Sequence, residues 1–180
     1  MKEALLNRLR DRDIPLKEFR QTAISLSALV ASEIYPRFQG QKVVLNAILR
    51  AGLSMLSAFQ EKFMHAPIGL IGIRRDEKTV APHLYYEKIP PLPSGAQILR
   101  LDPMLATGGS TNLALNLLKA RGAVHCTVIS LISAPEGQAF VKKNHPGVSL
   151  YTVALDRGLD DRKFIVPGLG DFGDRYFGTH

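Results

Sequence analysis

The sequence contains no tryptophan and only one cysteine among its 180 residues. A single cysteine cannot form an internal disulfide, so Cys126, in the apolar run HCTVISLIS, is expected to pack in a core. No apolar run reaches the roughly 18 residues that a membrane span requires, and residues 1–15, MKEALLNRLRDRDIP, carry charges throughout. These absences predict a cytoplasmic protein that has no membrane partner.

Charge of one sign is nowhere concentrated in the sequence. The net charge is +7 and the pI is near 9.7, but acidic residues lie among the basic ones in RLRDRD and IRRDEK. A basic chain suits either nucleic acid or small polyanions. The interleaved aromatic and basic residues of single-strand-binding proteins are also missing. We therefore expect a small polyanionic ligand and no nucleic acid.

Metal-ligand spacing is missing as well. His65, His83, His125 and His145 are isolated from one another and from the cysteine. A protein-only metal site needs several such ligands at short spacing. We expect no metal held directly by the protein.

The chain does show apolar strands that alternate with helical patterns. Helices are expected at 1–12, 16–34, 53–64, 110–121 and 135–144, and strands at 42–49, 68–74, 97–102, 126–133 and 149–155. Buried strands separated by helices predict an α/β fold, a predominantly parallel five-stranded sheet with helices on both faces. We expect one domain, 1–180, that begins with N-terminal helices in 1–35. Ligands of such sheets bind at the carboxyl ends of the strands.

The segment 75–93, RDEKTVAPHLYYEKIPPLP, interrupts the alternation. Its charged start, its prolines and the short run HLYYEKI predict a β-arm or flap. Segments of this length inside a compact domain are usually functional or disordered. We expect this one to cover a site.

The stretch LRLDPMLATGGST, 99–111, predicts a phosphate site. Backbone N–H groups at Gly108 and Gly109 are unobstructed by side chains, and a helix begins near Ser110, so amides and helix dipole would attract a phosphate. Further hydroxyls come from Thr107 and Thr111. The alternative is an ordinary strand-to-helix turn in which Ser110 caps the helix. No lysine follows the glycines, so this is not a Walker loop.

This stretch resembles the motif of uracil phosphoribosyltransferases that binds 5-phosphoribosyl-1-pyrophosphate (PRPP). Four further stretches resemble that family in the same order: ILRAGL (48–53), GIRRDEKT (72–79), ISAPEG (132–137) and VPGLGDFGDRYFGT (166–179). The resemblance implies a phosphoribosyltransferase fold. It also implies that the protein joins uracil to PRPP, giving UMP and pyrophosphate, with Mg²⁺ held through PRPP.

The resemblance implies specific residues for PRPP. The ribose and 5′-phosphate would be bound by Asp102, Pro103, Met104, Leu105, Ala106, Thr107, Gly108, Gly109 and Ser110. Arg50 and Arg75 would meet the pyrophosphate, in agreement with the way guanidinium groups bind phosphate oxygens. The alternatives are a surface ion pair for Arg50 and a solvated position for Arg75.

A C-terminal base-binding segment, 156–180, is implied in the same way. Uracil would be bound by Val166, Gly170, Asp171 and Phe172, with Asp171 also directed toward PRPP and its metal. Uracil presents two carbonyl acceptors and one N–H donor, which a glycine-rich loop can meet with backbone groups. We hypothesise that Asp171 helps the N1 proton leave, which makes it a catalytic candidate beside the two arginines. The alternative is a simple glycine-rich turn.

Three positions depart from the family pattern. Ala47 stands where proline is usual, Arg74 where tyrosine is common, and Arg100 lies in a strand that is normally apolar. These changes leave the ligand motifs intact. The expected partners are PRPP, uracil and further copies of the chain, in a homodimer or higher homo-oligomer.

Two other functions remain open at this point. One is a non-catalytic PRPP- or nucleotide-sensing protein on the same fold. The other is an enzyme for another base, although Pro103 stands where a hypoxanthine or guanine enzyme usually has a second acid. Product formation from uracil, compared with other bases, discriminates between them.

Overall fold

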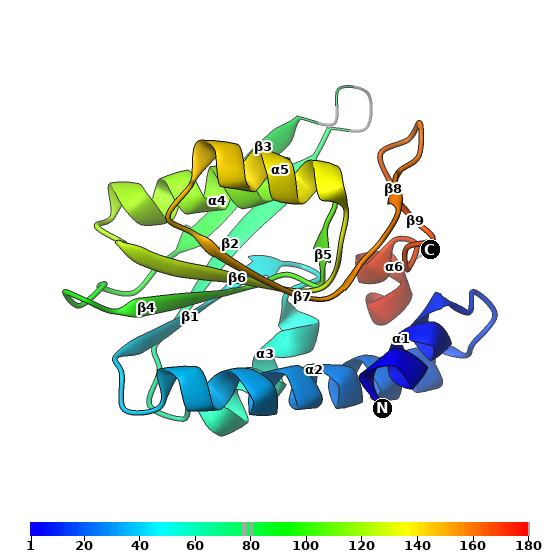
Figure 1. Ribbon diagram of the computed structural model, residues 1–180, viewed down its shortest axis with the longest axis horizontal. Helices are drawn as coiled ribbons and strands as arrows, with labels where there is room; N and C mark the ends of the chain where they lie inside the picture. The colour runs from blue at the N-terminus through cyan, green and yellow to red at the C-terminus, as the bar shows by residue number, and fades with distance from the viewer. Residues whose placement is uncertain (77–78, 80, 180) are drawn as a thin grey trace.

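The computed structural model describes residues 1–76, 79 and 81–179 (Figure 1). The helices are α1 (Lys2–Arg10), α2 (Leu16–Phe38), α3 (Leu53–Lys62), α4 (Gly109–Ala120), α5 (Pro135–Asn144) and α6 (Phe172–Phe177). The strands are β1 (Val43–Leu49), β2 (Ile68–Arg75), β3 (Pro82–Lys88), β4 (Gln97–Leu101), β5 (Met104–Leu105), β6 (His125–Ser133), β7 (Ser149–Leu155), β8 (Gly158–Leu159) and β9 (Ile165–Val166). No helix among the described residues is both long and apolar enough to cross a membrane.

The main sheet has the order β3-β2-β1-β4-β6-β5, and β7 pairs with the other edge of β6. The five predicted strands are all present as β1, β2, β4, β6 and β7, and their pairings are parallel. Strand β3 is antiparallel to β2, and the two-residue β5 pairs with the end of β6. The predicted α/β class with a predominantly parallel sheet is therefore confirmed. Its strands end together on one edge of the sheet.

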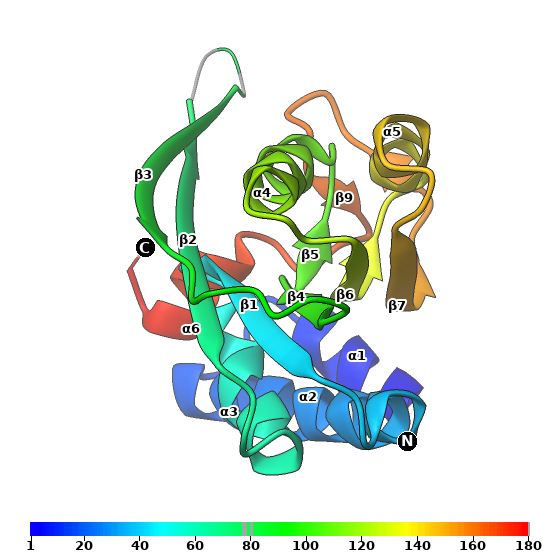
Figure 2. The same cartoon turned by 90° about the vertical axis from the view of Figure 1, so that its left-hand side faces the viewer.

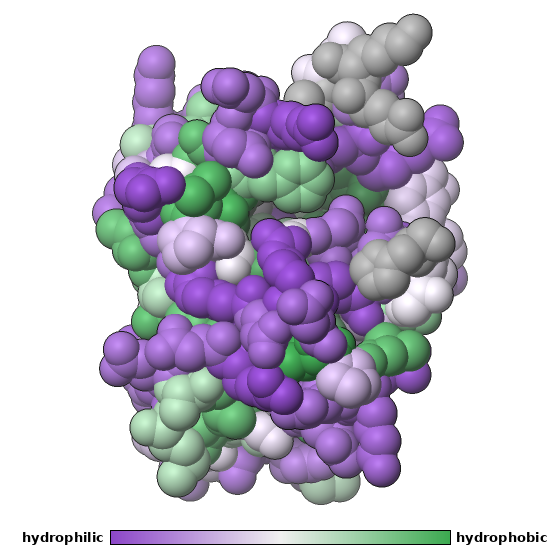
Figure 3. Space-filling model, turned by 90° about the vertical axis from the view of Figure 1, so that its right-hand side faces the viewer, coloured by the Kyte–Doolittle hydropathy of each residue, from purple (hydrophilic) through white to green (hydrophobic). Residues whose placement is uncertain are grey.

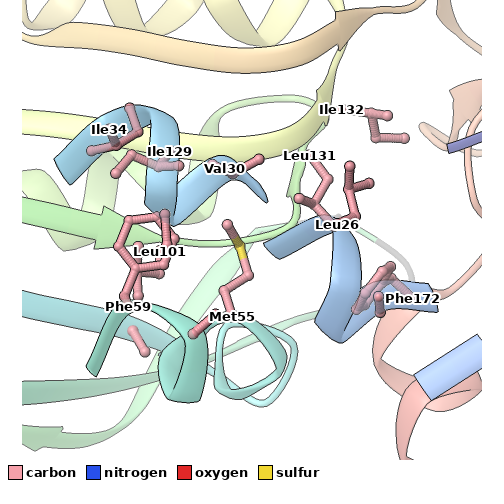
Figure 4. Packing of buried hydrophobic residues seen from close by; sticks show 14 of the residues in the cluster. Leu26, Val30, Ile34, Met55, Phe59, Leu101, Ile129, Leu131, Ile132 and Phe172 are labelled. Carbon is pink, nitrogen blue, oxygen red and sulfur yellow. The ribbon is translucent and has the colours of Figure 1, made fainter. Parts of the chain in front are cut away.

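Helices cover both faces of this sheet. Figure 2 shows α4 and α5 on one side and α1, α2 and α3 on the other. The layer between the sheet and α2 and α3 is packed with aliphatic and aromatic side chains, shown in Figure 4: Leu26, Val30, Ile34, Met55, Phe59, Leu101, Ile129, Leu131, Ile132 and Phe172. Complete burial of one such side chain contributes about 1.5–3 kcal/mol. This packing makes the sheet edge a rigid support for the loops that follow each strand.

Some element boundaries differ from the predicted ones. Helix α2 runs past 34 to Phe38, and Tyr35 in this extension packs on Phe63 with 5.2 Å between ring centroids. Tertiary packing of this kind commonly prolongs a helix beyond what local propensity specifies. Helix α6 and the β8–β9 hairpin were not predicted, because elements of two to six residues are too short to show a periodic pattern.

The predicted arm is present as the antiparallel pair of β2 and β3. Residues 77, 78 and 80 of the predicted segment 75–93 lie outside the described residues. The Arg121 guanidinium, just after α4, is bonded to the Glu87 carboxylate of β3 at 2.6 Å. The arm is thus tied to the helix that follows the predicted phosphate loop.

Candidate active site

A cavity of about 410 Å³ opens at the carboxyl ends of β1, β2 and β4. Its lining comes from the strand ends, the arm, the 102–111 loop and the C-terminal segment: Ile48, Leu49, Arg50, Ala51, Ile73, Arg74, Arg75, Tyr85, Asp102, Met104, Ala106, Thr107, Gly108, Gly109, Ser110, Thr111, Asp171 and Gly173. Figure 3 looks onto this end of the molecule, where hydrophilic residues cover most of the surface. The cavity lies where ligands of open parallel sheets bind.

The predicted phosphate loop forms one wall of this cavity. Gly108 has a φ of +85° and is the N-cap of α4. A Cβ there would lie 3.0 Å from the Phe140 ring and 3.1 Å from the Gly137 carbonyl oxygen, so glycine is required on both grounds. No side chain caps this helix, so the alternative in which Ser110 is the cap is wrong. The free N–H groups of the first turn are available to an anion.

Alternate residues of the loop point away from the cavity. Pro103 and Leu105 are buried, and the Pro103 carbonyl accepts hydrogen bonds from the amides of Leu131 and Ile132 at 2.9 and 3.1 Å. Leu105 packs in the layer under α4 and α5. These two predicted PRPP residues therefore fix the loop against β6, while Met104 and Ala106 between them line the cavity.

Arg50 follows the end of β1 and reaches the C-terminal helix. Its Nη2 donates to Asp174 Oδ1 at 2.7 Å and its Nη1 to Thr179 Oγ1 at 3.0 Å. The side chain is 49% exposed and lines the cavity, so it is an ion-paired group within reach of solvent and of the site. Arg75 is exposed at the end of β2, and it has no ion pair with another described residue. Both predicted pyrophosphate residues thus lie at the same cavity.

Asp102 lies at the base of the cavity with its side chain 13% exposed. Its Oδ2 is 3.2 Å from Arg100 Nη2, and its Oδ1 accepts the Met104 amide at 3.5 Å. Burial raises the pKa of this carboxyl, and the charges of Arg100 and Arg75 act in the opposite direction. An ionised carboxylate at this point could accept hydrogen bonds from two neighbouring sugar hydroxyls.

Metal binding by the protein alone finds no support in the described residues, where no cluster of three or more His, Cys, Asp or Glu side chains occurs. Asp102 and Asp171 both line the cavity. Mg²⁺ is commonly held by one or two carboxylates together with substrate phosphate oxygens. The donor set fits a Mg²⁺ ion that arrives with a phosphorylated substrate.

Residues 33–179 match the family described as uracil phosphoribosyltransferase. This chain belongs to the uracil phosphoribosyltransferase family. The uracil phosphoribosyltransferase of Shouchella clausii is 41% identical over 193 residues, which cover 97% of this chain and 92% of that protein. The enzyme of the same name from Pediococcus pentosaceus is 42% identical, with the same coverage.

Solved structures agree with the family assignment. The AQ2163 protein of Aquifex aeolicus has a TM-score of 0.93 at 29% identity and covers 99% of this chain and 94% of its own. Adenine phosphoribosyltransferase from Leishmania donovani has a TM-score of 0.58 at 14% identity, over 71% of this chain and 64% of its own. The second likeness shows that this uracil phosphoribosyltransferase family member has the phosphoribosyltransferase fold.

The uracil-binding residues that the family resemblance implies lie differently from one another. Asp171 lines the cavity and caps α6, where its Oδ1 accepts the Asp174 amide at 2.9 Å. Phe172 is fully buried, 5.1 Å from the Phe19 ring. Val166 pairs with Gly158 in the β8–β9 hairpin. The structure brings only Asp171 of this set into the cavity wall.

The fourth member of that set, Gly170, has a φ of +75°, and the Arg12 guanidinium occupies the space into which a Cβ would point. Gly170 therefore contributes backbone groups alone. Several residues that line the cavity were not predicted: Ile48, Leu49, Ala51, Ile73, Arg74, Tyr85 and Gly173. Tyr85 belongs to the predicted arm, so its place in an arm over a strand edge was the available signal.

Proposed function

We propose that this protein transfers the phosphoribosyl group of PRPP to N1 of uracil, giving UMP and pyrophosphate. The observation that carries the proposal is that a free helix N-terminus after Gly108, two arginines and two carboxylates share one cavity of about 410 Å³. Phosphate, pyrophosphate and ribose hydroxyls need donors, cations and acceptors in that order. The curated relatives at 41% and 42% identity carry the name of this activity.

The loop 102–110 would bind the phosphoribosyl part. The amides of Gly108 and Gly109 and the hydroxyls of Thr107 and Ser110 would hold the 5′-phosphate. Asp102 would accept hydrogen bonds from the ribose hydroxyls. The helix N-terminus adds a favourable potential for the phosphate charge. Pro103 to Leu105 would contribute through the backbone, which their packing on β6 holds in place.

Arg50 and Arg75 would neutralise pyrophosphate as it departs. Charge develops on the leaving group while the anomeric carbon acquires oxocarbenium character, so fixed cations near the leaving oxygens lower the barrier. Mg²⁺, when bound through PRPP and the carboxylates, supplies further charge neutralisation of the phosphate oxygens. The arm would exclude water from this carbon, which favours transfer to uracil over hydrolysis.

The C-terminal segment 156–180 would bind the base with backbone groups of Val166, Gly170, Asp171 and Phe172. This segment is anchored from below, since Arg175 donates to the Leu169 carbonyl at 2.8 Å. Fixed carbonyl and amide groups can match the acceptor and donor pattern of uracil. Asp171 would help to accept the N1 proton as the new bond forms.

We also propose that a single 180-residue domain works in the cytoplasm as a homodimer or higher homo-oligomer. Leu84, Tyr85 and Tyr86 are large exposed side chains on the edge strand β3. Exposed apolar groups on an edge strand favour association with another chain. Light scattering coupled to size-exclusion chromatography tests the mass in solution.

The deciding experiment is an assay with PRPP, Mg²⁺ and radiolabelled uracil beside cytosine, hypoxanthine and orotate. A donor that meets the uracil 4-carbonyl would face the cytosine amino group, and an unpaired buried donor costs about 1–3 kcal/mol. Cytosine turnover at least about tenfold below that of uracil supports the proposal. Ligand binding without UMP formation would instead favour a sensor, and comparable use of cytosine would reject the base assignment.

A further inference from the structure

Arg100 is a fully buried arginine in the middle of β4, with 0% of its surface exposed. It stands beside Asn46 of β1 and Val128 of β6 in the parallel register. Its neighbours two residues before and across the sheet, Ile98 and Val128, belong to the apolar layer under α4 and α5. A permanently charged side chain in such a layer demands an explanation.

The contacts of Arg100 point in a single direction. Nη2 is 3.2 Å from Asp102 Oδ2, whereas Nε and Nη1 have no hydrogen-bond partner among the described protein atoms. The adjacent Asn46 side chain also lacks a partner in the described part of the chain, so it offers Arg100 no compensation. Removing a guanidinium from water is costly unless its donors are satisfied, and an apolar side chain would suit this layer better. Fold stability therefore does not account for Arg100.

Asp102 is the group through which Arg100 meets the cavity. Arg100 itself does not line the cavity, but Asp102 does, and the two residues are on the same face of the strand end. We propose that Arg100 is a positioning residue, whose guanidinium holds the Asp102 carboxylate ionised and directed toward the ribose hydroxyls of PRPP. This inference rests on the proposed role of Asp102 as a ribose acceptor.

The electrostatics around Asp102 agree with this geometry. Burial raises the pKa of Asp102, and Arg100 is the largest influence that lowers it, ahead of the Met104 amide and Arg75 of β2. The Cys126 thiol of β6 is the other titratable group that faces Arg100, and burial raises its pKa to about 11. The thiol is thus neutral in the working range of pH, so Asp102 is the counter-charge of Arg100.

The test is the pH profile of kcat/KM for PRPP in the Arg100→Met variant. Without the guanidinium, Asp102 should bind a proton at higher pH, so the acidic limb should move upward by about one unit or more. At pH 6.5 the variant should lose about tenfold in kcat/KM relative to the wild type and recover most of it by pH 9, since one pKa unit is a factor of ten. A purely structural role would lower activity equally at all pH values.

Two further variants separate charge from packing. Arg100→Lys keeps a positive charge near Asp102 and should hold the acidic limb within about half a unit of the wild type. Ser130→Ala removes another buried, unpartnered polar atom from the neighbouring strand and should leave the profile unchanged. Equal shifts in the Lys and Met variants would overturn the inference, and this comparison still decides if Arg100→Gln must replace a poorly folded Met variant.

Asp102→Asn distinguishes failure of this inference from failure of the site. If Asp102→Asn leaves the KM for PRPP unchanged, the ribose assignment itself is wrong. If it raises KM while Arg100→Met leaves the pH profile unmoved, only the positioning role is rejected. When both are correct, the double variant should be no worse than Asp102→Asn alone, because Arg100 acts through that carboxylate.

Discussion

The guanidinium of Arg50 donates to the carboxylate of Asp174 at 2.7 Å, joining the end of β1 to helix α6. The two residues are 124 positions apart in the sequence. Arg50 is the proposed pyrophosphate residue, and Asp174 lies in the proposed base-binding segment. Pyrophosphate would therefore take the place of a carboxylate at this guanidinium, which links occupation of the PRPP site to the C-terminal segment.

Arg50→Ala should lower kcat/KM for PRPP by about 10²-fold or more, on the scale of losing a charge-stabilising group from a transition state. Arg75→Ala should have an effect of the same order. Arg8→Ala is the matched control, because Arg8 is 43% exposed and ion-paired with Glu18 but lies on α1. Steady-state kinetics with varied PRPP measure all three. Wild-type kinetics in both site variants would show that these arginines have only the surface roles considered as alternatives.

Gly109→Val should abolish PRPP binding while the fold is retained. A Cβ at Gly109 would meet only Pro82 and Thr107 atoms at 3.6–3.7 Å, which is ordinary contact, so the structure has room for a side chain. A branched side chain would nevertheless stand where the 5′-phosphate must approach the backbone amide. Calorimetric titration with PRPP, alongside circular dichroism, separates binding from folding.

The Gly109→Ala variant is the graded control for this position. It should fold normally and bind PRPP with an intermediate loss. Near-normal PRPP affinity in a folded Gly109→Val protein would contradict the assignment of the loop. Gly108 is unsuitable for this test, since its φ of +85° and the Phe140 contact would disturb the fold itself.

The sheet and the phosphate loop could be predicted because their signals are local. Each of the five parallel strands is a continuous apolar run, and Gly108-Gly109 after Asp102 marks a turn onto a helix. The C-terminal segment gave no such signal. Whether Phe172 faces the cavity or the core depends on the distant Phe19, and a six-residue helix has no period that could reveal it.

The cavity wall also exceeds what sequence reasoning could supply. Tyr85 reaches the site because β3 folds back on β2, and Asp174 because α6 packs near the end of β1. These contacts join segments that are far apart in the chain. The burial of Arg100 could be anticipated only as an anomaly in an apolar strand, and its partner only from the side of the strand on which Asp102 lies.

His145 should make the fold sensitive to acid. It is buried between α4 and the end of α5, with Nδ1 2.7 Å from Lys119 Nζ and Nε2 2.9 Å from Asn112 Oδ1. An ammonium only donates, so Nδ1 must accept and the ring must be neutral. Burial, followed by the Lys119 charge, lowers the pKa of His145 below its ordinary value. The folded state therefore resists protonation.

The unfolded chain binds this proton more readily, so stability is present above the unfolded pKa of about 6.5 and is lost as the pH falls below it. We expect the free energy of unfolding to fall between pH 7.5 and 5.5, with each unit of pKa separation worth about 1.4 kcal/mol at most. His145→Gln should show a shallower fall, and His125→Gln, at an exposed position, should follow the wild type. Urea titrations at the two pH values measure the slopes, and identical slopes in all three proteins would reject the role of His145.

Cys126 should resist alkylation until the protein unfolds. Burial raises the pKa of this thiol to about 11. At pH 8 about one thiol in a thousand is then ionised, and the thiolate is the reactive form. Iodoacetamide should label native protein slowly and protein in concentrated urea fully, as mass spectrometry can follow. Rapid, complete labelling of the native protein would show that β6 is more accessible than the structure indicates.

Arg175 should tie uracil binding to the N-terminal helices. Its guanidinium donates to the carbonyls of Leu9 and Leu169 at 2.7 and 2.8 Å, also to that of Asp11, and stacks on Phe19 at 4.2 Å. Arg175→Met would leave buried carbonyls without donors, so we expect a loss of about 2–4 kcal/mol in unfolding free energy. Because Leu169 immediately precedes the proposed uracil loop, the KM for uracil should rise several-fold more than the KM for PRPP.

Arg20→Met is the control for this prediction. Arg20 donates to the Tyr176 and Phe177 carbonyls beyond the loop, at 2.7 and 3.3 Å, so its loss should lower stability without favouring one substrate. Urea unfolding and separate KM determinations for uracil and PRPP are the measurements, made below the unfolding transition of the weaker variant. If Arg175→Met raises both KM values equally, the arginine supports the whole domain. A selective rise for uracil would instead place the base-binding loop under the control of a contact to α1.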